Sequence, residues 1–237
     1  TNTTTANAAL ARSGGTMTGN IVLGTNTVGG LQITTTGTGN TGLGTGAVDS
    51  ITTGTNDVGL GNNALTANTT GYNNTASGFQ AMMANTTGYN NTANGANTLI
   101  ANTTGIANIA LGYASLGSNT TASNNTALGY AALNANTTAS NNTAVGYYAL
   151  LANTTGTYNT ASGFESMKAN TTGSYNAAYG RLSLEANTTG NENTAIGNTA
   201  LYLNTSGINN TAVGSAALNA NTTGADNVAV GKDALLA

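Results

Sequence analysis

Residues 142–158 read NTAVGYYALLANTTGTY, and variants of this 17-residue unit fill the chain from about residue 40 to its last residue. We number the positions of the unit 1–17, so that Asn142 stands at position 1 and Gly146 at position 5. Adding one residue to a paired strand turns its side chains to the opposite face, so a constant spacing predicts units that stack in register. Position 5 is a column of expected turn glycines with no insertion between them: Gly44, Gly61, Gly78, Gly95, Gly112, Gly129, Gly146, Gly163, Gly180, Gly197, Gly214 and Gly231.

Position 9 is apolar in every unit, which predicts a continuous core along the stack. This column consists of Val48, Leu65, Met82, Leu99, Leu116, Leu133, Leu150, Met167, Leu184, Leu201, Leu218 and Leu235. Seventeen residues are too few for a helical hairpin repeat, and no segment keeps a helical period for ten residues. They suit one coil with two short strands, Asn-Thr-Ala-x-Gly and Ala-Leu-x-Ala, and a turn at Asn-Thr-Thr-Gly, while repeated Asn can form ladders along the axis. The predicted fold is all-β: a parallel β-solenoid, or β-roll, of about twelve coils.

The composition excludes several classes of function. Only 5% of the 237 residues are charged and the net charge is −3, so there is no basic stripe to bind nucleic acid. Cys and His are absent, which excludes thiolate metal sites and Ser/His/Asp or Cys/His catalysis. No apolar run approaches the ~20 residues of a membrane span. We expect no enzyme activity, catalytic residue, cofactor or metal site, and we interpret Glu165 and Glu185 as surface charges rather than a glycosidase pair.

Position 6 is aromatic in four successive units, at Tyr113, Tyr130, Tyr147 and Phe164, with Tyr148 beside them. Stacked coils would place these rings in one column about 4.8 Å apart. Two interpretations stay open: a strip that contacts glycans, or an aromatic ladder that stabilises the solenoid or a contact between chains. The frequent Asn-x-Thr triplets, such as residues 68–70, are interpreted as a by-product of Asn/Thr-rich turns rather than as glycosylation sites.

Residues 1–39 do not follow the period, and we expect an irregular β segment or linker joined to the repeat region of residues 40–237. Within this segment, residues 13–19 (SGGTMTG) resemble a motif that recurs in the tail fibres of tailed bacteriophages. The repeats, such as residues 142–150, resemble those of phage fibre shafts and the head repeats of trimeric autotransporter adhesins. This resemblance implies a homotrimeric, left-handed β-roll that is exposed on a virion or outside a cell and works in host attachment.

The expected function is that of a structural segment of a phage tail fibre, located in the virion, which gives length and stiffness and supports adhesion to the host cell. Its expected partners are two further copies in a homotrimer, other fibre or tail proteins, and host surface glycans, without nucleic acid or membrane insertion. The alternative is a cellular surface adhesin or an extracellular filament with the same fold. A third hypothesis is an ice-binding solenoid, since Thr69 and Thr70 recur in nearly every unit, although adjacent strand residues face opposite sides.

Overall fold

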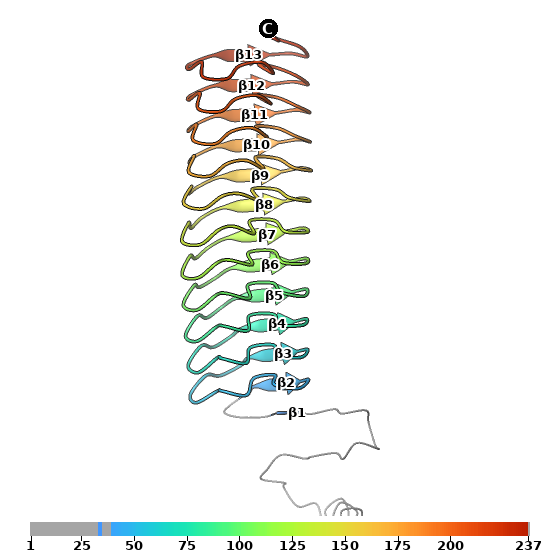
Figure 1. The fold of residues 1–237 in the computed structure, drawn as a ribbon, viewed down its shortest axis with the longest axis vertical. Coiled ribbons are helices and arrows are strands. Elements are labelled where there is room, and N and C mark those ends of the chain that lie inside the picture. Colours follow the sequence, from blue (N-terminus) through green and yellow to red (C-terminus); the bar gives the residue numbers. More distant parts are fainter. Residues whose placement is uncertain (1–32, 35–38, 237) are drawn as a thin grey trace, which may run out of the picture.

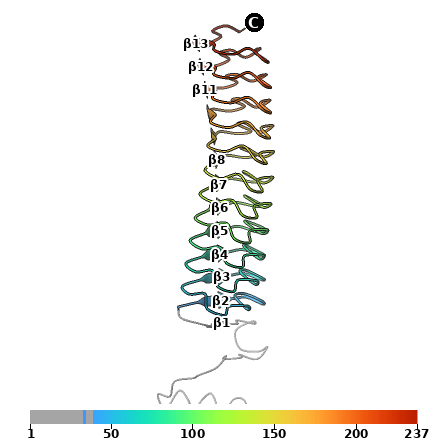
Figure 2. The same cartoon turned by 90° about the vertical axis from the view of Figure 1, so that its left-hand side faces the viewer.

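The computed structural model describes residues 33–34 and 39–236, and these residues form a β-solenoid around one 13-stranded sheet. The strands are β1 (Ile33–Thr34), β2 (Thr41–Leu43), β3 (Val58–Leu60), β4 (Thr75–Ser77), β5 (Thr92–Asn94), β6 (Ile109–Leu111), β7 (Thr126–Leu128), β8 (Thr143–Val145), β9 (Thr160–Ser162), β10 (Ala177–Tyr179), β11 (Thr194–Ile196), β12 (Thr211–Val213) and β13 (Val228–Val230). Strand β1 pairs antiparallel with β2, and all later pairs are parallel. Figure 1 shows β2–β13 stacked along the axis of a rod, and Figure 2 shows these strands along one side of it. The predicted fold class is confirmed, while the phage-fibre-like motif of residues 13–19 lies outside the described residues.

Every parallel pair joins residues 17 apart, so the register does not slip anywhere between β2 and β13. Within β8, Ala144 at position 3 lies between Ala127 and Ala161 of the neighbouring strands. Side chains alternate across a strand, so position 3 points into the coil while positions 2 and 4 point outward. Position 3 is Gly in β2 and β3 and Ala in the ten later strands, which indicates that the interior has little room.

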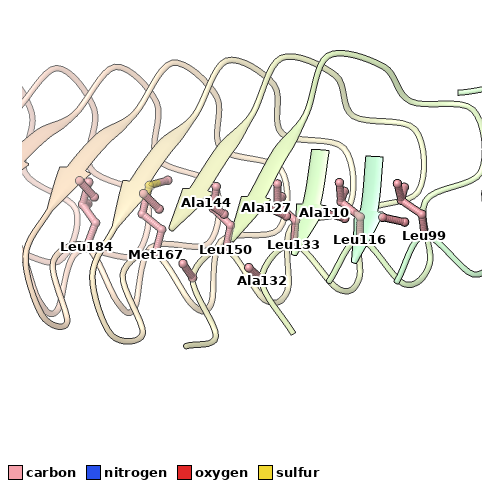
Figure 3. Close-up of a cluster of buried hydrophobic side chains, with 14 of the residues drawn as sticks. Leu99, Ala110, Leu116, Ala127, Ala132, Leu133, Ala144, Leu150, Met167 and Leu184 are labelled. Carbon is pink, nitrogen blue, oxygen red and sulfur yellow. The ribbon is translucent and has the colours of Figure 1, made fainter. Parts of the chain in front are cut away.

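The core is a narrow file of side chains along the rod. Each complete coil contributes one large apolar residue at position 9, such as Leu133 or Leu150, and both of these are 0% exposed. Figure 3 shows these side chains in a row beside the small residues at position 3, such as Ala127 and Ala144. Burying one such leucine stabilises the fold by roughly 1.5–3 kcal/mol, so the hydrophobic contribution is regular but small in each unit.

The prediction of a second strand at Ala-Leu-x-Ala is wrong, because this segment forms a run of turns. Positions 7 and 9 adopt the left-handed backbone region, for example Tyr148 with φ 55° and Leu150 with φ 51°. Such a conformation costs about 1–3 kcal/mol for a residue other than glycine. The fold offsets this cost because the conformation turns the position 9 side chain into the core and lets the Leu150 N–H donate to the Ser166 carbonyl at 3.0 Å.

The position 5 glycines line up along the axis, as the period predicts. Their φ angles lie between 119° and 148°, a region that other residues rarely adopt. From Gly44 to Gly214, an added Cβ would also overlap the carbonyl group of the next glycine in the file. Both the backbone angle and the close approach of successive coils therefore require glycine here.

Backbone hydrogen bonds run along the rod in both directions. The N–H groups at positions 5, 7 and 17 donate to the preceding coil, as Gly129, Ala131 and Asn141 do. Those at positions 2, 9 and 11 donate to the next coil, as Leu133 and Ala135 do. Each coil is thus bonded on both sides by groups spread around its whole circumference.

Two ladders of buried asparagine side chains accompany these backbone bonds. In the ladder at position 12, the Nδ2 of Asn153 donates to Oδ1 of Asn136 in the preceding coil (3.1 Å) and to the Gly156 carbonyl (2.9 Å). In the ladder at position 1, the backbone N–H of Asn142 donates to Oδ1 of Asn125, and its own Nδ2 also donates to the Gly156 carbonyl (both 2.9 Å). One carbonyl at position 15 therefore ties both ladders together in each coil.

Asp57 replaces asparagine at position 1, and this exception coincides with the start of the ladder at position 12. The preceding position 12 residue is Ile51, so Nδ2 of Asn68 has no amide oxygen below it and donates to Oδ2 of Asp57 at 2.9 Å. The other carboxyl oxygen accepts the backbone N–H of Asn74 at 2.8 Å. Asp57 is 0% exposed, and its burial raises the pKa of the carboxyl above the usual value against the lowering effect of these hydrogen bonds.

Replacing one ladder amide tests how much the ladders stabilise the rod. Asn136→Ala would leave Oδ1 of Asn119 and one proton of the Asn153 amide without partners inside the coil, at about 1–3 kcal/mol for each group. We expect the free energy of unfolding, measured by urea denaturation, to fall by about 2–5 kcal/mol. The matched control is Asn124→Ala at exposed position 17, which should cost less than about 1 kcal/mol because Asn124 is exposed and Ala107 occupies that position naturally. Equal losses would contradict a stabilising role of the ladder.

The pH dependence of stability tests the environment of Asp57. Because the pKa of this carboxyl is raised in the folded state, the folded chain favours the protonated form. The stabilisation by the protonated carboxyl is complete below about pH 4, which is the pKa of an aspartate in the unfolded chain. This stabilisation is lost as the pH rises through the raised pKa of the folded state. We expect the stability of the unmodified chain, relative to Asp57→Asn, to decrease between pH 3 and pH 7 in urea titrations. A relative stability that increases with pH would show that the hydrogen bonds from Asn68 and Asn74 outweigh burial.

Candidate binding surfaces of the rod

The described residues hold no group of three or more His, Cys, Asp or Glu side chains placed to bind a metal. None of them belongs to a helix that is long and apolar enough to cross a bilayer. Of the two glutamates discussed above, Glu165 forms an ion pair with Lys168 at 3.2 Å on the partly exposed surface. Such a pair is screened by solvent and contributes little to stability. The features of the surface that could carry function are therefore its columns of aromatic, hydroxyl and aliphatic side chains.

The aromatic residues at position 6 form one stacked column on the outside of the rod. Ring centroids lie 5.2 Å apart for Tyr113 and Tyr130, 5.4 Å for Tyr130 and Tyr147, and 5.3 Å for Tyr147 and Phe164. The planes of successive rings differ by only 7–17°. All four side chains are exposed, but each inner ring has both faces against its neighbours. Only the ring edges and hydroxyl groups of the inner members face solvent.

This stacking bears on the two interpretations of the column. A sugar that stacks on an aromatic side chain needs a free ring face. At one end of the column, the Arg181 guanidinium lies over the Phe164 ring, 5.9 Å from its centroid, and occupies that face. At the other end, the unit before Tyr113 carries Ala96 at position 6. The inner rings are therefore arranged as an aromatic ladder between coils, and a free ring face is expected only where the column is interrupted.

Tyr148, which we grouped with the column, lies beside it at position 7. Its ring centroid is 4.1 Å from that of Tyr147, with planes tilted by 42°, and Lys168 lies over the Tyr148 ring at 5.8 Å. A hydrogen bond from the Tyr147 hydroxyl to Tyr148, together with partial burial and nearby negative charge, raises the pKa of Tyr147 to about 12. The ionisation of Tyr147 therefore depends on its neighbour Tyr148, which lies at the side of the column.

Two further aromatic pairs were missed from the sequence. Tyr72 stacks on Tyr89 at position 16, with centroids 4.6 Å apart, and Tyr158 stacks on Tyr175 at position 17, at 5.1 Å. The two tyrosines of each pair are 17 residues apart in the sequence, so a search for aromatic residues at this spacing would have found them. The surface therefore carries several short ladders, and position 6 holds the longest of them.

The threonines at positions 13 and 14, on which the ice-binding hypothesis rests, differ in their hydrogen bonding. The Thr69 hydroxyl, at position 13, donates to the Thr86 carbonyl of the next coil at 3.1 Å, and most of its equivalents do the same. Position 14 is an unbroken column of exposed hydroxyl residues: Thr53, Thr70, Thr87, Thr104, Thr121, Thr138, Thr155, Thr172, Thr189, Ser206 and Thr223. The turn therefore presents one file of hydroxyl groups with no protein partner, rather than the two-dimensional grid that ice binding calls for.

The outer face of the sheet carries the side chains at positions 2 and 4. Position 2 is mostly threonine, whereas position 4 is often aliphatic, and Val145 and Ile196 are exposed there. Polar residues such as Ser77 and Asn94 interrupt the aliphatic column. This flat face combines modest apolar surface with hydroxyl groups and lacks charged residues.

The structure also bears on the Asn-x-Thr triplets. Asn68 and Asn85, which begin such triplets, are 0% exposed, and their amide nitrogens donate within the position 12 ladder. A glycan attached to such a nitrogen would replace a buried donor proton and would have to pass through the packed coils. The folded rod therefore cannot carry glycans at this position, which agrees with the interpretation of these triplets as turn sequences.

Ultraviolet titration of tyrosine ionisation tests the pairing of Tyr147 with Tyr148. Removing Tyr147 by Tyr147→Phe should delete an ionisation near pH 12 from the absorbance titration of the chain. Tyr148→Phe should shift that ionisation to lower pH, because the hydrogen bond that holds the Tyr147 proton is lost. An unchanged ionisation near pH 12 in Tyr148→Phe would show that the hydrogen bond is not the cause.

Similarity to known proteins does not identify the chain. No protein-family model, curated protein sequence or solved structure matches it. The fold and the surfaces described above are therefore the basis for proposing a function.

Proposed function

We propose that this chain is a shaft segment of a bacteriophage tail fibre, a stiff spacer that holds a recognition element away from the virion and supports attachment to the host surface. The observation that carries the proposal is the constant register from β2 to β13. With about 4.8 Å for each coil, these strands span roughly 55 Å. Length is the property that grows with every added unit, since each unit repeats the same core and the same amide ladders.

The chemistry of the surface supports a structural rather than a catalytic role. Among the described residues, most polar groups on the outside are amides and hydroxyls, and the few charged side chains are scattered. Reach and display require regular shape, which the ladders provide, and do not require reactive groups. The resemblance of residues 13–19 and of the repeats to phage fibres supports the virion as the location, and a cellular surface adhesin or extracellular filament is the alternative that shares the same fold.

We further propose that the fibre is a homotrimer, with the outer face of the sheet as the contact between chains. Exposed aliphatic side chains at position 4, such as Val145 and Ile196, form an intermittent apolar column there. Contiguous exposed apolar surface is typical of sites of protein association. Association of three rods along this face would bury the column and increase the bending stiffness of the fibre.

The oligomeric mass and the shape in solution test this function. Light scattering after size-exclusion chromatography should give three times the 23.2 kDa chain mass, and small-angle X-ray scattering should give the profile of an elongated rod. Ile196→Asp should weaken the trimer because it places a charge in the proposed contact, whereas Thr155→Asp, at exposed position 14, should not. A monomeric mass for the unmodified chain would reject the trimer, and a globular scattering profile would reject the spacer.

A further inference from the structure

The aromatic column at position 6 is interrupted by one alanine. Reading along the rod, position 6 is Phe79, Ala96 and then Tyr113, where the uninterrupted column begins. Phe79 is 51% exposed and Tyr113 is 49% exposed, and neither stacks on another ring across Ala96. We call the space between these two rings the Ala96 gap. It is the one place in the described repeats where aromatic residues stand on both sides of a single non-aromatic member of this column.

The width of the Ala96 gap follows from the spacing of the coils. Stacked rings in the same column lie 5.2–5.4 Å apart per coil. Two coil steps therefore separate Phe79 from Tyr113 by about 10 Å, with only a methyl group between them. A flat ring at van der Waals distance from both neighbours would need about 7–8 Å and would leave slack. A puckered six-membered ring with axial hydrogens on both faces is thicker and fills the space better.

Amide side chains flank the Ala96 gap in the chain. Gln80 and Asn97 stand at position 7, directly after Phe79 and Ala96, and Asn94 precedes Gly95 at position 4. Their side chains make no hydrogen bond to the described residues, although most other asparagines of the rod are bonded. Asn97 Oδ1 is moreover the one buried side-chain oxygen or nitrogen of the described residues without a partner. Because this oxygen is shut off from solvent, it is not available to a ligand that enters the gap from outside.

The uninterrupted part of the column lacks these amides. Beside Tyr130 and Tyr147, position 4 is Leu128 or Val145 and position 7 is alanine or tyrosine. The free ring faces and these amide residues are therefore neighbours along the chain. The two rings and the amide of Gln80 next to Phe79 offer two apolar faces and a group that can donate and accept hydrogen bonds, which matches a ligand with apolar faces and a hydroxylated rim.

We propose that the Ala96 gap binds a hexopyranose with equatorial hydroxyl groups, held between the rings of Phe79 and Tyr113. The axial C–H groups on the two faces of the sugar contact the two rings, while its hydroxyl groups bond to the amide of Gln80. A single sugar ring with so few contacts binds weakly, in the millimolar range of Kd. The site needs only the folded rod, so it does not depend on whether the rod belongs to a phage.

Saturation-transfer NMR with methyl β-D-glucopyranoside as the probe tests the site on the full chain. We expect transfer from aromatic protons to the axial protons on both faces of the sugar. Ala96→Tyr should join Phe79 to the column, fill the gap, and reduce binding about tenfold or more. This variant should stay folded, because Phe79 and Tyr113 occupy the same position in adjacent coils. Ser215→Tyr, which adds a tyrosine at position 6 far from the gap, should bind as the unmodified chain does.

Two more variants keep the test decisive. Phe79→Ala removes one ring without adding volume and should reduce binding as Ala96→Tyr does, with melting followed by circular dichroism. Tyr130→Ala opens a gap of similar width in which Ala114 takes the place that Gln80 has beside the Ala96 gap, and it should not create a second site. The proposal is overturned if the unmodified chain shows no transfer, or if Ala96→Tyr and Phe79→Ala bind the probe as well as the unmodified chain. Neither result would affect the mass or the rod shape on which the spacer function depends.

Discussion

The buried side-chain amides at positions 1 and 12 are the interaction on which the rest of the rod depends. Each coil buries a single large apolar side chain, so the hydrophobic effect alone cannot fix the position of one coil on the next. The amides do so, because each one must meet both its counterpart 17 residues away and a carbonyl in its own coil. An insertion of one residue would leave these donors and acceptors unpaired in a dry interior, at a cost that rises with every coil affected.

This requirement explains features that are unfavourable when each coil is considered alone. Leucines at position 9 adopt left-handed backbone angles, and glycines at position 5 approach one another too closely for any side chain. Both conformations bring successive coils to the separation at which the ladders form. Asp57 also reflects the need to pair buried amides. Asn68 has no asparagine below it in the position 12 ladder, and the carboxyl of Asp57 accepts its hydrogen bond instead. The rod accepts local strain where the strain keeps the buried amides of the two ladders paired.

The sequence predicted the solenoid and its core because both follow from the period. The aromatic column was predicted for the same reason, as the same offset brings Tyr130 beside Tyr113. The second strand was predicted wrongly because Ala-Leu-x-Ala has no glycine or asparagine at position 9 to indicate a left-handed angle, and the conformation of Leu150 is imposed by its neighbours. The free ring faces at Phe79 and Tyr113 could not be recognised before the inner rings were seen to cover one another.

The opposed directions of the backbone hydrogen bonds have a consequence for a rod of any length. In an α-helix all peptide dipoles point the same way, and partial charges collect at the two ends. Here the N–H groups of Gly129 and Leu133, four residues apart in one coil, point to opposite ends of the rod. Their dipoles oppose one another and cancel in part within each coil, so each added coil contributes less polarity along the axis than the same number of residues in an α-helix. Such a shaft can grow by duplication of its unit while less partial charge collects at its tips than in an α-helix of equal residue number.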